Sequence, residues 1–337
     1  MKILVTGGLG FIGSNFILYL MKNHPRLKIT NIDAEFLGSN RKNLQELKNN
    51  RNYEYIKGNI TEGKLIEKLV SKNDAVINFA AESHVDRSIF DSKPFLESNI
   101  MGVYTLLDAI RKKKTRTRFV QISTDEVFGS RKTGYAKEKD VFRPSNPYSA
   151  SKASAELIAE SYVKTYDIDV VITRCTNNFG PRQFPEKLIP KTIIRSQKNM
   201  KVPIYGNGKN KRDWLFVEDH CSAITKALFK GKAGESYNIS SSNELTNIQL
   251  IEKILDMLGK PKDLIYFVED RPGHDLRYGL DSTKLRNEMG WKPKRKFDDD
   301  LQDTITWYLQ NSSWWKELAT SEMLHPTPWK QYHKQGK

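Results

Sequence analysis

The sequence predicts an α/β protein built on a doubly wound parallel sheet, with a smaller C-terminal lobe. Apolar strand-like runs alternate with helical patterns through the first ~175 residues, which is typical of a parallel sheet covered by helices on both faces. Three glycines, Gly7, Gly10 and Gly13, separate the first predicted strand from the first helix. With 337 residues the chain is too long for one small core. Together these observations favour a Rossmann-type sheet domain followed by a substrate-binding lobe.

The elements of the predicted sheet domain follow one another closely. The predicted strands are Lys2–Thr6, Lys28–Asp33, Tyr53–Lys57, Ala75–Phe79, Phe119–Ser123 and Val170–Arg174. The predicted helices are Ile12–Lys22, Gly63–Lys72, Pro94–Lys112 and Tyr148–Tyr166. Beyond Arg174 proline and glycine become frequent, which indicates a lobe rich in binding loops, and Trp214–Leu228 is expected to return to the sheet. We therefore assign 1–175 and 214–240 to the sheet domain, and 176–213 and 241–330 to the second lobe.

Composition narrows the class of protein and its compartment. The net charge of +15 comes from lysines and arginines scattered along the chain, so a solvated surface explains it better than a nucleic-acid site. No run of about 18 apolar residues predicts a membrane span, and the strand pattern that begins at Lys2 leaves no room for a signal peptide. Cys175 and Cys221 suggest no disulfide framework, so we expect a cytoplasmic protein. We expect no metal site, nucleic-acid partner or membrane partner.

The glycine loop predicts a dinucleotide site. Such a loop must turn tightly, let its backbone approach a pyrophosphate and pack the following helix on the sheet, and each need favours glycine. The helix N-terminus then presents unpaired amides to the phosphates. Asp33 lies 20 residues beyond Gly13, at the end of the second predicted strand. A carboxylate there accepts hydrogen bonds from a ribose 2′-hydroxyl and repels a 2′-phosphate, so NAD is favoured over NADP.

A second constellation follows the fifth predicted strand. Tyr148 and Lys152 are four residues apart and share one face of a helix. A neighbouring ammonium and the nicotinamide charge would lower the pKa of the phenol and make Tyr148 a base for an alcohol proton. Asp125 and Glu126 follow Thr124, and one carboxyl can act as an acid and the other as a base if their pKa values differ. Taken alone, the Tyr–Lys pair fits a surface pair better, and the two carboxyls fit a solvated turn with a helix cap equally well.

The same residues carry a resemblance to a known family. The chain resembles the extended short-chain dehydrogenase/reductases, and among them the dTDP-glucose 4,6-dehydratases, over nearly its whole length. The matching segments are Thr6–Gly13, Ala80–Ser88, Thr124–Glu126, Tyr148 with Lys152, Asn177–Pro181, Phe184–Pro190, Arg212–Trp214 and Asp270–Asp275.

The resemblance implies a mechanism without net oxidation. Tyr148 takes the proton of the hexose 4-hydroxyl, near which Thr124 forms a hydrogen bond, while hydride passes from carbon 4 to NAD. Glu126 then removes the proton from carbon 5, and protonated Asp125 gives a proton to the leaving 6-hydroxyl. Hydride returns to carbon 6, so the product is dTDP-4-keto-6-deoxyglucose, a precursor for deoxysugars such as those of the dTDP-rhamnose pathway. Lys152 holds the nicotinamide ribose.

The resemblance also implies binding residues and a homodimer joined by helices like Pro94–Lys112 and Tyr148–Tyr166. The expected NAD-binding residues are Gly7, Gly10, Phe11, Ile12, Gly13, Asp33, Asn59, Ile60, Ala80, Ala81, Ser98, Tyr148, Lys152 and Asn178. The expected substrate-binding residues are Ser83, His84, Thr124, Asn177, Glu186, Lys187, Leu188, Pro203, Tyr205, Arg212, Asn247, Arg271 and His274, of which Arg212 and Arg271 suit the diphosphate.

Some positions depart from the family pattern, and rival functions remain. Asn59 stands where aspartate is common near the adenine, and Phe128 and Phe179 stand where tyrosine is common. The amino-acid sequence of Asp33–Asn40 also differs from the usual family sequence. A UDP-glucose 4,6-dehydratase would use the same mechanism on a nucleotide sugar whose base, uracil, lacks the methyl group of thymine. A nucleotide-sugar 4-epimerase or a decarboxylase would share Tyr148, Lys152 and NAD but would not need Asp125 beside Glu126. A non-catalytic NAD-sensing or RNA-binding protein would need none of these groups. The aromatic tail from about Ser312 either caps a surface or contacts a partner subunit.

Overall fold

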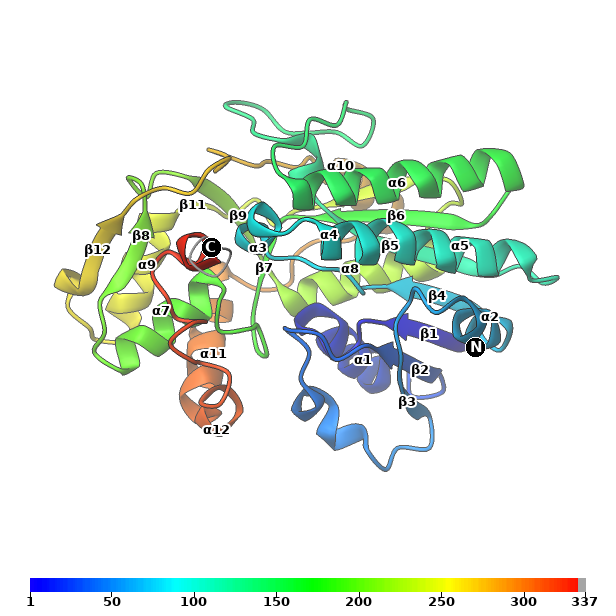
Figure 1. Cartoon of the computed structure of the whole chain (residues 1–337), viewed down its shortest axis with the longest axis horizontal. Coiled ribbons are helices and arrows are strands. Elements are labelled where there is room, and N and C mark those ends of the chain that lie inside the picture. The colour runs from blue at the N-terminus through cyan, green and yellow to red at the C-terminus, as the bar shows by residue number, and fades with distance from the viewer. Residues whose placement is uncertain (333–337) are drawn as a thin grey trace.

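The protein is built around one large parallel sheet with a smaller lobe at its side (Figure 1). The structure is a computed structural model that describes residues 1–332. Within these residues the main sheet has seven strands in the order β10-β6-β5-β4-β1-β2-β3, and all neighbouring strands run parallel. The order reverses between β1 and β4, so the predicted doubly wound Rossmann-type fold is confirmed. The strands of this sheet are β1 (Lys2–Thr6), β2 (Lys28–Asp33), β3 (Tyr53–Lys57), β4 (Ala75–Asn78), β5 (Arg118–Thr124), β6 (Val170–Cys175) and β10 (Ser236–Ile239).

Helices cover both faces of the sheet because successive strand residues point to opposite faces and are apolar on each of them. Ile3 and Val5 pack with α1 and α8, whereas Leu4 between them packs with α2 and α5. Strands buried on both faces in this way are typical of parallel sheets. The elements around the sheet are α1 (Phe11–Asn23), the 3₁₀ turn η1 (Arg41–Leu47), α2 (Gly63–Ser71), α3 (Val85–Phe90), α4 (Lys93–Phe95), the π-helical turn η2 (Leu96–Met101), α5 (Gly102–Lys112), the 3₁₀ turn η3 (Asp125–Phe128), α6 (Pro147–Tyr166), α8 (Val217–Lys230) and α10 (Thr283–Met289).

The second lobe has its own core and two small sheets. Phe179, Ile193, Trp214 and Leu250 lie in that core. The strands of the lobe are β7 (Asn177–Phe179), β9 (Lys211–Phe216) and β11 (Glu244–Thr246) in one sheet, and β8 (Val202–Tyr205) and β12 (Ile265–Val268) in the other. Its helices are α7 (Leu188–Gln197), α9 (Asn247–Met257), the 3₁₀ turn η4 (Lys262–Leu264), α11 (Phe297–Gln310), α12 (Ser312–Trp315) and α13 (Pro328–Tyr332). No helix among residues 1–332 is both long enough and apolar enough to cross a bilayer.

The boundary between the two parts differs in detail from the division drawn on the sequence. Trp214 lies in β9 of the small sheet, and the return to the main sheet begins with α8 and ends with β10. Leu285, Met289 and Trp291, which we assigned to the second lobe, pack in the core of the main sheet. The segment that carries these three residues contributes no strand to the main sheet, so the alternation of strands and helices in the sequence could not show that it packs there.

A buried ion pair joins α6 to the main sheet. The guanidinium of Arg174, on β6, binds the carboxylate of Glu156, on α6, with an Nη2–Oε2 distance of 2.6 Å, and both side chains are almost fully buried. The guanidinium also lies over the rings of Phe128 and Phe142. Glu156 follows Lys152 by one helical turn, and Phe128 ends η3, so this pair connects the two segments that carry the predicted catalytic residues.

Candidate active site

The glycine loop forms a cradle with no room for side chains. Gly7 has a φ of +66°, and a Cβ atom there would lie 2.6 Å from the backbone nitrogen of Ala80. A Cβ atom at Gly13 would lie 2.4 Å from the carbonyl oxygen of Gly7, so the first turn of α1 could no longer pack on the loop. Gly10 is the N-cap of α1 and no side chain caps it. The amide end of α1 therefore faces an open cavity, as a pyrophosphate site requires.

Asp33 ties the glycine loop to the next segment. Its carboxylate accepts hydrogen bonds from the backbone nitrogens of Leu9 (2.9 Å) and Glu35 (2.8 Å) and from the hydroxyl of Ser39 (2.7 Å). The side chain is buried at the edge of the cavity. A fixed carboxylate at this place suits a ribose hydroxyl and opposes a phosphate.

Two adjoining cavities hold the predicted site residues. The first, of about 320 Å³, is lined by the glycine loop, the C-terminal ends of the central strands and α6, and the second, of about 190 Å³, is lined mainly by the second lobe. They share Ser83, Glu126, Asn177, Glu186 and Lys187. The first also contains Gly7, Gly10, Phe11, Ile12, Gly13, Asp33, Asn59, Ile60, Ala80, Ala81, Ser98, Thr124, Asp125, Tyr148, Lys152 and Asn178, and the second also contains His84, Leu188, Pro203, Tyr205, Arg212, Asn247, Arg271 and His274. The fold thus brings every predicted site residue to one of two connected cavities.

The two carboxyls after β5 lie in a short, rigid turn. Thr124 is the N-cap of η3, because its hydroxyl accepts a hydrogen bond from the backbone nitrogen of Glu126 (3.3 Å) and donates one to Asp125 (3.1 Å). Burial, followed by the negative charge of Glu126, raises the pKa of Asp125 well above its ordinary value. Burial also raises the pKa of Glu126. Asp125 is only 3% exposed, so the alternative of a solvated turn is wrong.

Tyr148 and Lys152 lie in the first turns of α6. Asn146 caps this helix, with Pro147 at its first position, so the helix begins just before Tyr148. Both side chains are buried, and the alternative of a surface pair is therefore wrong. The ammonium of Lys152 donates to the carbonyl of Ile122 (2.6 Å), and burial lowers the pKa of Lys152 to about 8.

The expected lowering of the Tyr148 pKa does not come from the chain itself. Burial, and then the negative charge of Glu126, raises the pKa of Tyr148 well above 10. The sequence shows that Lys152 shares a helix face with Tyr148, but it does not show how deeply the helix start is buried. In the chain alone the desolvation of the phenolate therefore outweighs the effect of the ammonium. A cation bound in the first cavity would act in the direction we expected.

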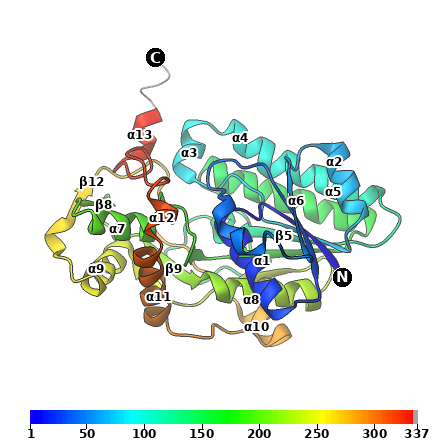
Figure 2. The ribbon, with the colours of Figure 1, turned by 90° about the horizontal axis from the view of Figure 1, so that it is seen from below.

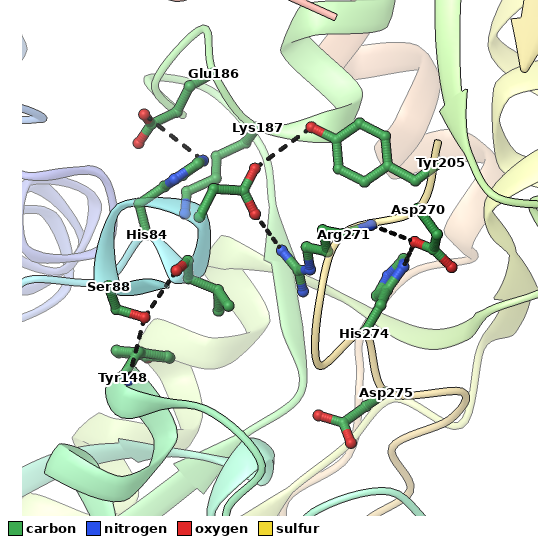
Figure 3. Close-up of polar contacts among 12 residues, drawn as sticks. His84, Ser88, Tyr148, Glu186, Lys187, Tyr205, Asp270, Arg271, His274 and Asp275 are labelled. Atoms are coloured by element: carbon green, nitrogen blue, oxygen red, sulfur yellow. Dashed lines mark hydrogen bonds and ion pairs between the residues drawn. The ribbon is translucent and has the colours of Figure 1, made fainter. Parts of the chain in front are cut away.

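Polar groups from both parts of the chain line the second cavity (Figure 3). The carboxylate of Asp86 on α3 binds the guanidinium of Arg271 at 2.8 Å and accepts a hydrogen bond from the hydroxyl of Tyr205 at 3.4 Å. His84 lies 3.7 Å from Glu186, and burial lowers the pKa of its imidazole. The ring of His274 contacts Asp270 at 2.6 Å, and its pKa is lowered to about 4 by burial and then by the charge of Arg271.

Three ionisable residues of the second cavity were not among those we selected from the sequence: Asp86, Lys191 and Tyr278. Asp86 pairs with Arg271 and belongs to the segment Ala80–Ser88, which we had singled out. Lys191 lies one turn after Lys187 on α7, and burial lowers its pKa to about 8. Tyr278 lies 3.4 Å from Glu126. Spacing along α7 could have indicated Lys191, whereas nothing in the sequence pointed to Tyr278.

The first cavity suits a polar dinucleotide. Its walls contain buried polar atoms that have no hydrogen-bond partner among residues 1–332: Ser123 Oγ, Asp125 Oδ2, Asn177 Oδ1, Asn178 Oδ1 and Gln183 Oε1. Buried groups of this kind are normally paired, so these atoms indicate a ligand with donors of its own. With the glycine cradle and Asp33, they fit NAD. Asn59, the departure near the adenine, lines the same cavity, and its side-chain oxygen accepts a hydrogen bond from Thr61.

The lowered pKa of Lys152 leads us to expect a loss of activity at alkaline pH. Its pKa in the folded chain, about 8, lies below the ordinary value of 10.5, so its ammonium is present below pH 8 and is lost as the pH rises through that value. We expect kcat/KM to fall above about pH 8, because the lysine then loses the charge with which we expect it to hold the cofactor. A steady-state pH profile measures this. A fall that begins only near pH 10.5 would show that Lys152 keeps its ordinary pKa.

Replacing Arg271 is expected to weaken substrate binding. In Arg271→Lys the charge remains, but the planar fork that holds Asp86 and suits a diphosphate is lost. We expect KM to rise about 10- to 100-fold, as for the loss of a charge-assisted hydrogen bond, with a smaller change in kcat. Arg277→Lys is the matched control, because Arg277 pairs with Glu244 outside both cavities and its replacement should leave KM unchanged. Equal KM values for the two variants would contradict the assignment.

Comparison with known proteins agrees with this geometry. The family model described as GDP-mannose 4,6 dehydratase matches residues 4–304. The dTDP-glucose 4,6-dehydratase of Actinoplanes sp. is 46% identical over 94% of this chain and 100% of the relative, and the low-salt glycan biosynthesis protein Agl12 of Haloferax volcanii is 48% identical over 92% and 99%. The crystal structure of dTDP-glucose 4,6-dehydratase from Bacillus anthracis in complex with NAD is 46% identical, covers 94% of this chain and 99% of its own, and has a TM-score of 0.89. The chain therefore belongs to the dTDP-glucose 4,6-dehydratase family.

Proposed function

We propose that this protein is an NAD-dependent dehydratase that converts dTDP-glucose to dTDP-4-keto-6-deoxyglucose. The observation that carries the proposal is the carboxyl pair of buried Asp125 and partly buried Glu126, beside Tyr148 in a cavity that joins a nucleotide cradle to a cationic pocket. Relatives of this name match almost the whole chain, and the NAD-bound structure has the same fold.

The residues of the chain divide the work among them. Tyr148 accepts the proton of the hexose 4-hydroxyl, and Thr124 orients that hydroxyl. Glu126 removes the proton from carbon 5 once carbon 4 is a ketone. Asp125 has a raised pKa, remains protonated and gives its proton to the leaving 6-hydroxyl. NAD, when bound, supplies the hydride acceptor at the first stage and the hydride donor at the last.

The carboxyl pair favours elimination over the rival reactions. A 4-epimerase oxidises and reduces the same carbon and needs only Tyr148, Lys152 and the cofactor. A 4-epimerase gains nothing from a protonated carboxyl beside a second carboxyl, and burying two adjacent carboxyls costs free energy. The raised pKa of Asp125 therefore supports a reaction that needs a proton donor.

The choice of thymine over uracil rests on the relatives. The two bases differ by one methyl group, which contributes about 1 kcal/mol in a pocket. Pro203, Tyr205, Asn247 and Ile251 line the part of the second cavity that we assign to the base. UDP-glucose is therefore the alternative substrate.

The function is tested by incubating the protein with dTDP-glucose in heavy water and analysing the product by mass spectrometry and NMR. A 4-keto-6-deoxy sugar that is one water lighter and carries deuterium at carbon 5 is expected. A galactose isomer without deuterium would mean an epimerase. Turnover of UDP-glucose alone would keep the mechanism and change the base, and no turnover of either would contradict the proposal.

We also propose a homodimer in the cytoplasm. Leu96, Met101, Tyr104, Leu157 and Tyr166 are large apolar residues of η2, α5 and α6 that are at least 43% exposed in the single chain. Such a group of residues supports an interface along these helices. Both cysteines, Cys175 and Cys221, are buried and unbridged, which supports a reducing compartment. Light scattering of the protein and of Leu157→Asp tests the dimer, and a wild-type monomer would contradict it.

A further inference from the structure

The C-terminal segment lies against the outer wall of the second cavity. In Figures 1 and 2, α13 lies beside α3, and the two helices are in contact. Trp329 on α13 is only 4% exposed, and its ring meets the ring of Tyr205 edge-on, with centroids 4.5 Å apart and an angle of 80° between the planes. Tyr205 lines the cavity, whereas Trp329 stands behind it. The tail therefore contacts the substrate pocket through one aromatic pair.

Cationic residues of α7 hold the segment in this place. Arg195 donates to the carbonyl of Leu324 (2.5 Å), and Lys191 donates to the carbonyl of His325 (3.3 Å). Lys191 itself lines the second cavity. Pro328 is the first residue of α13, where its fixed φ favours the start of a helix. The ring of Trp329 is thus attached to a segment that is anchored to the pocket wall.

The side chain of Tyr205 has one hydrogen-bond partner, Asp86, and two aromatic neighbours, His274 and Trp329, within residues 1–332. Its hydroxyl reaches Asp86 across the cavity at 3.4 Å, a long hydrogen bond, and the ring of His274 lies edge-on with centroids 6.2 Å apart. The indole of Trp329 is the closer of these two aromatic partners. Without it the tyrosine could turn away from the cavity and from Asp86.

We infer that Trp329 is a positioning residue for the nucleotide half of the substrate, which it serves by holding the ring of Tyr205 against the cavity. The inference rests on the proposed function. It assigns to the C-terminal tail a part in recognising the pyrimidine diphosphate, and none in the chemistry at the hexose. Asp125 and Tyr148 line the first cavity and Glu126 lies at its junction with the second, whereas Tyr205 lines the second cavity alone.

The test compares four proteins loaded with NAD: wild type, Trp329→Leu, Trp329→Phe and Lys330→Ala. Trp329→Leu keeps an apolar side chain, although a smaller one, and removes the aromatic contact. We expect it to raise both the Kd of dTDP, measured by calorimetry, and the KM of dTDP-glucose by about 3- to 10-fold, as for the loss of one aromatic pair. kcat and the NAD content should change less than about twofold, because a pocket contact outside the chemistry acts on binding alone. Trp329→Phe retains a ring and should recover most of the affinity.

Lys330→Ala is the matched control on the same helix. Lys330 pairs with Glu269, both side chains are exposed, and an exposed pair contributes little. An unchanged Kd for dTDP in Trp329→Leu would overturn the inference. The inference would also be overturned if kcat, the NAD content and the melting temperature of Trp329→Leu fell together with its affinity for dTDP, because that result would mean a general effect on the fold. If the wild-type protein itself failed to bind dTDP, the proposed function would be wrong. If the wild-type protein and Trp329→Leu bound dTDP equally well, only the inference about Trp329 would be wrong.

Discussion

Replacing Asp125 by asparagine is expected to lower the rate of dehydration by about 10²- to 10⁴-fold, the usual contribution of a general acid. The amide has the same shape but cannot give a proton to the leaving 6-hydroxyl. Oxidation at carbon 4, which we assign to Tyr148, should continue. We therefore expect NADH to accumulate on the protein when dTDP-glucose is added, which its absorbance reports, while the 4-keto-6-deoxy product forms slowly.

Glu126→Gln distinguishes the acid from the base. In Asp125→Asn the carboxylate of Glu126 can still remove the proton from carbon 5, so deuterium from heavy water should enter that position before water is lost. In Glu126→Gln this exchange should be slowed by a similar factor as the dehydration. The two variants thus share a slow overall reaction and differ in exchange. The same exchange rate in both would contradict the division of roles.

Removing the partner of Arg174 is expected to have the largest effect on stability. Glu156→Ala leaves a guanidinium that is 1% exposed without its carboxylate. A charge left unpaired in the interior costs about 3–5 kcal/mol, so the free energy of unfolding should fall by that amount. Urea denaturation measures it as a lower midpoint with an unchanged slope. Because the pair joins α6 to η3 through Phe128, activity should also fall before the fold is lost.

Glu67→Ala is the control for this change. Glu67 pairs with Lys112 at 2.7 Å, but both side chains are about half exposed. Water screens such a pair, and its loss should change stability by less than about 1 kcal/mol. If the two variants were equally stable, burial of the Arg174–Glu156 pair would not be the source of its contribution.

Much of the fold could be predicted because its signals are local. The six predicted strands of the main sheet lie within two residues of the observed ones at each end, since a strand buried on both faces is a short apolar run between turn residues. Gly7 and Gly13 mark the cradle because backbone lies too close for any side chain. The seventh strand, β10, and the return of Leu285, Met289 and Trp291 to the main core could be seen only in the tertiary structure.

The candidate site divides in the same way. The sequence by itself determined which chemical groups are present: the glycine loop, Asp33, the carboxyl pair after β5, and Tyr148 with Lys152. The tertiary structure decided which of them are buried, and so why the pKa values of Asp125 and Tyr148 rise and that of Lys152 falls. It also decided the partners across the second cavity. Asp86 and Arg271 are 185 residues apart, and Tyr205 meets Trp329 from the far end of the chain. Such pairs leave no periodic trace in a sequence, because burial and long-range contact arise only when separate segments pack together.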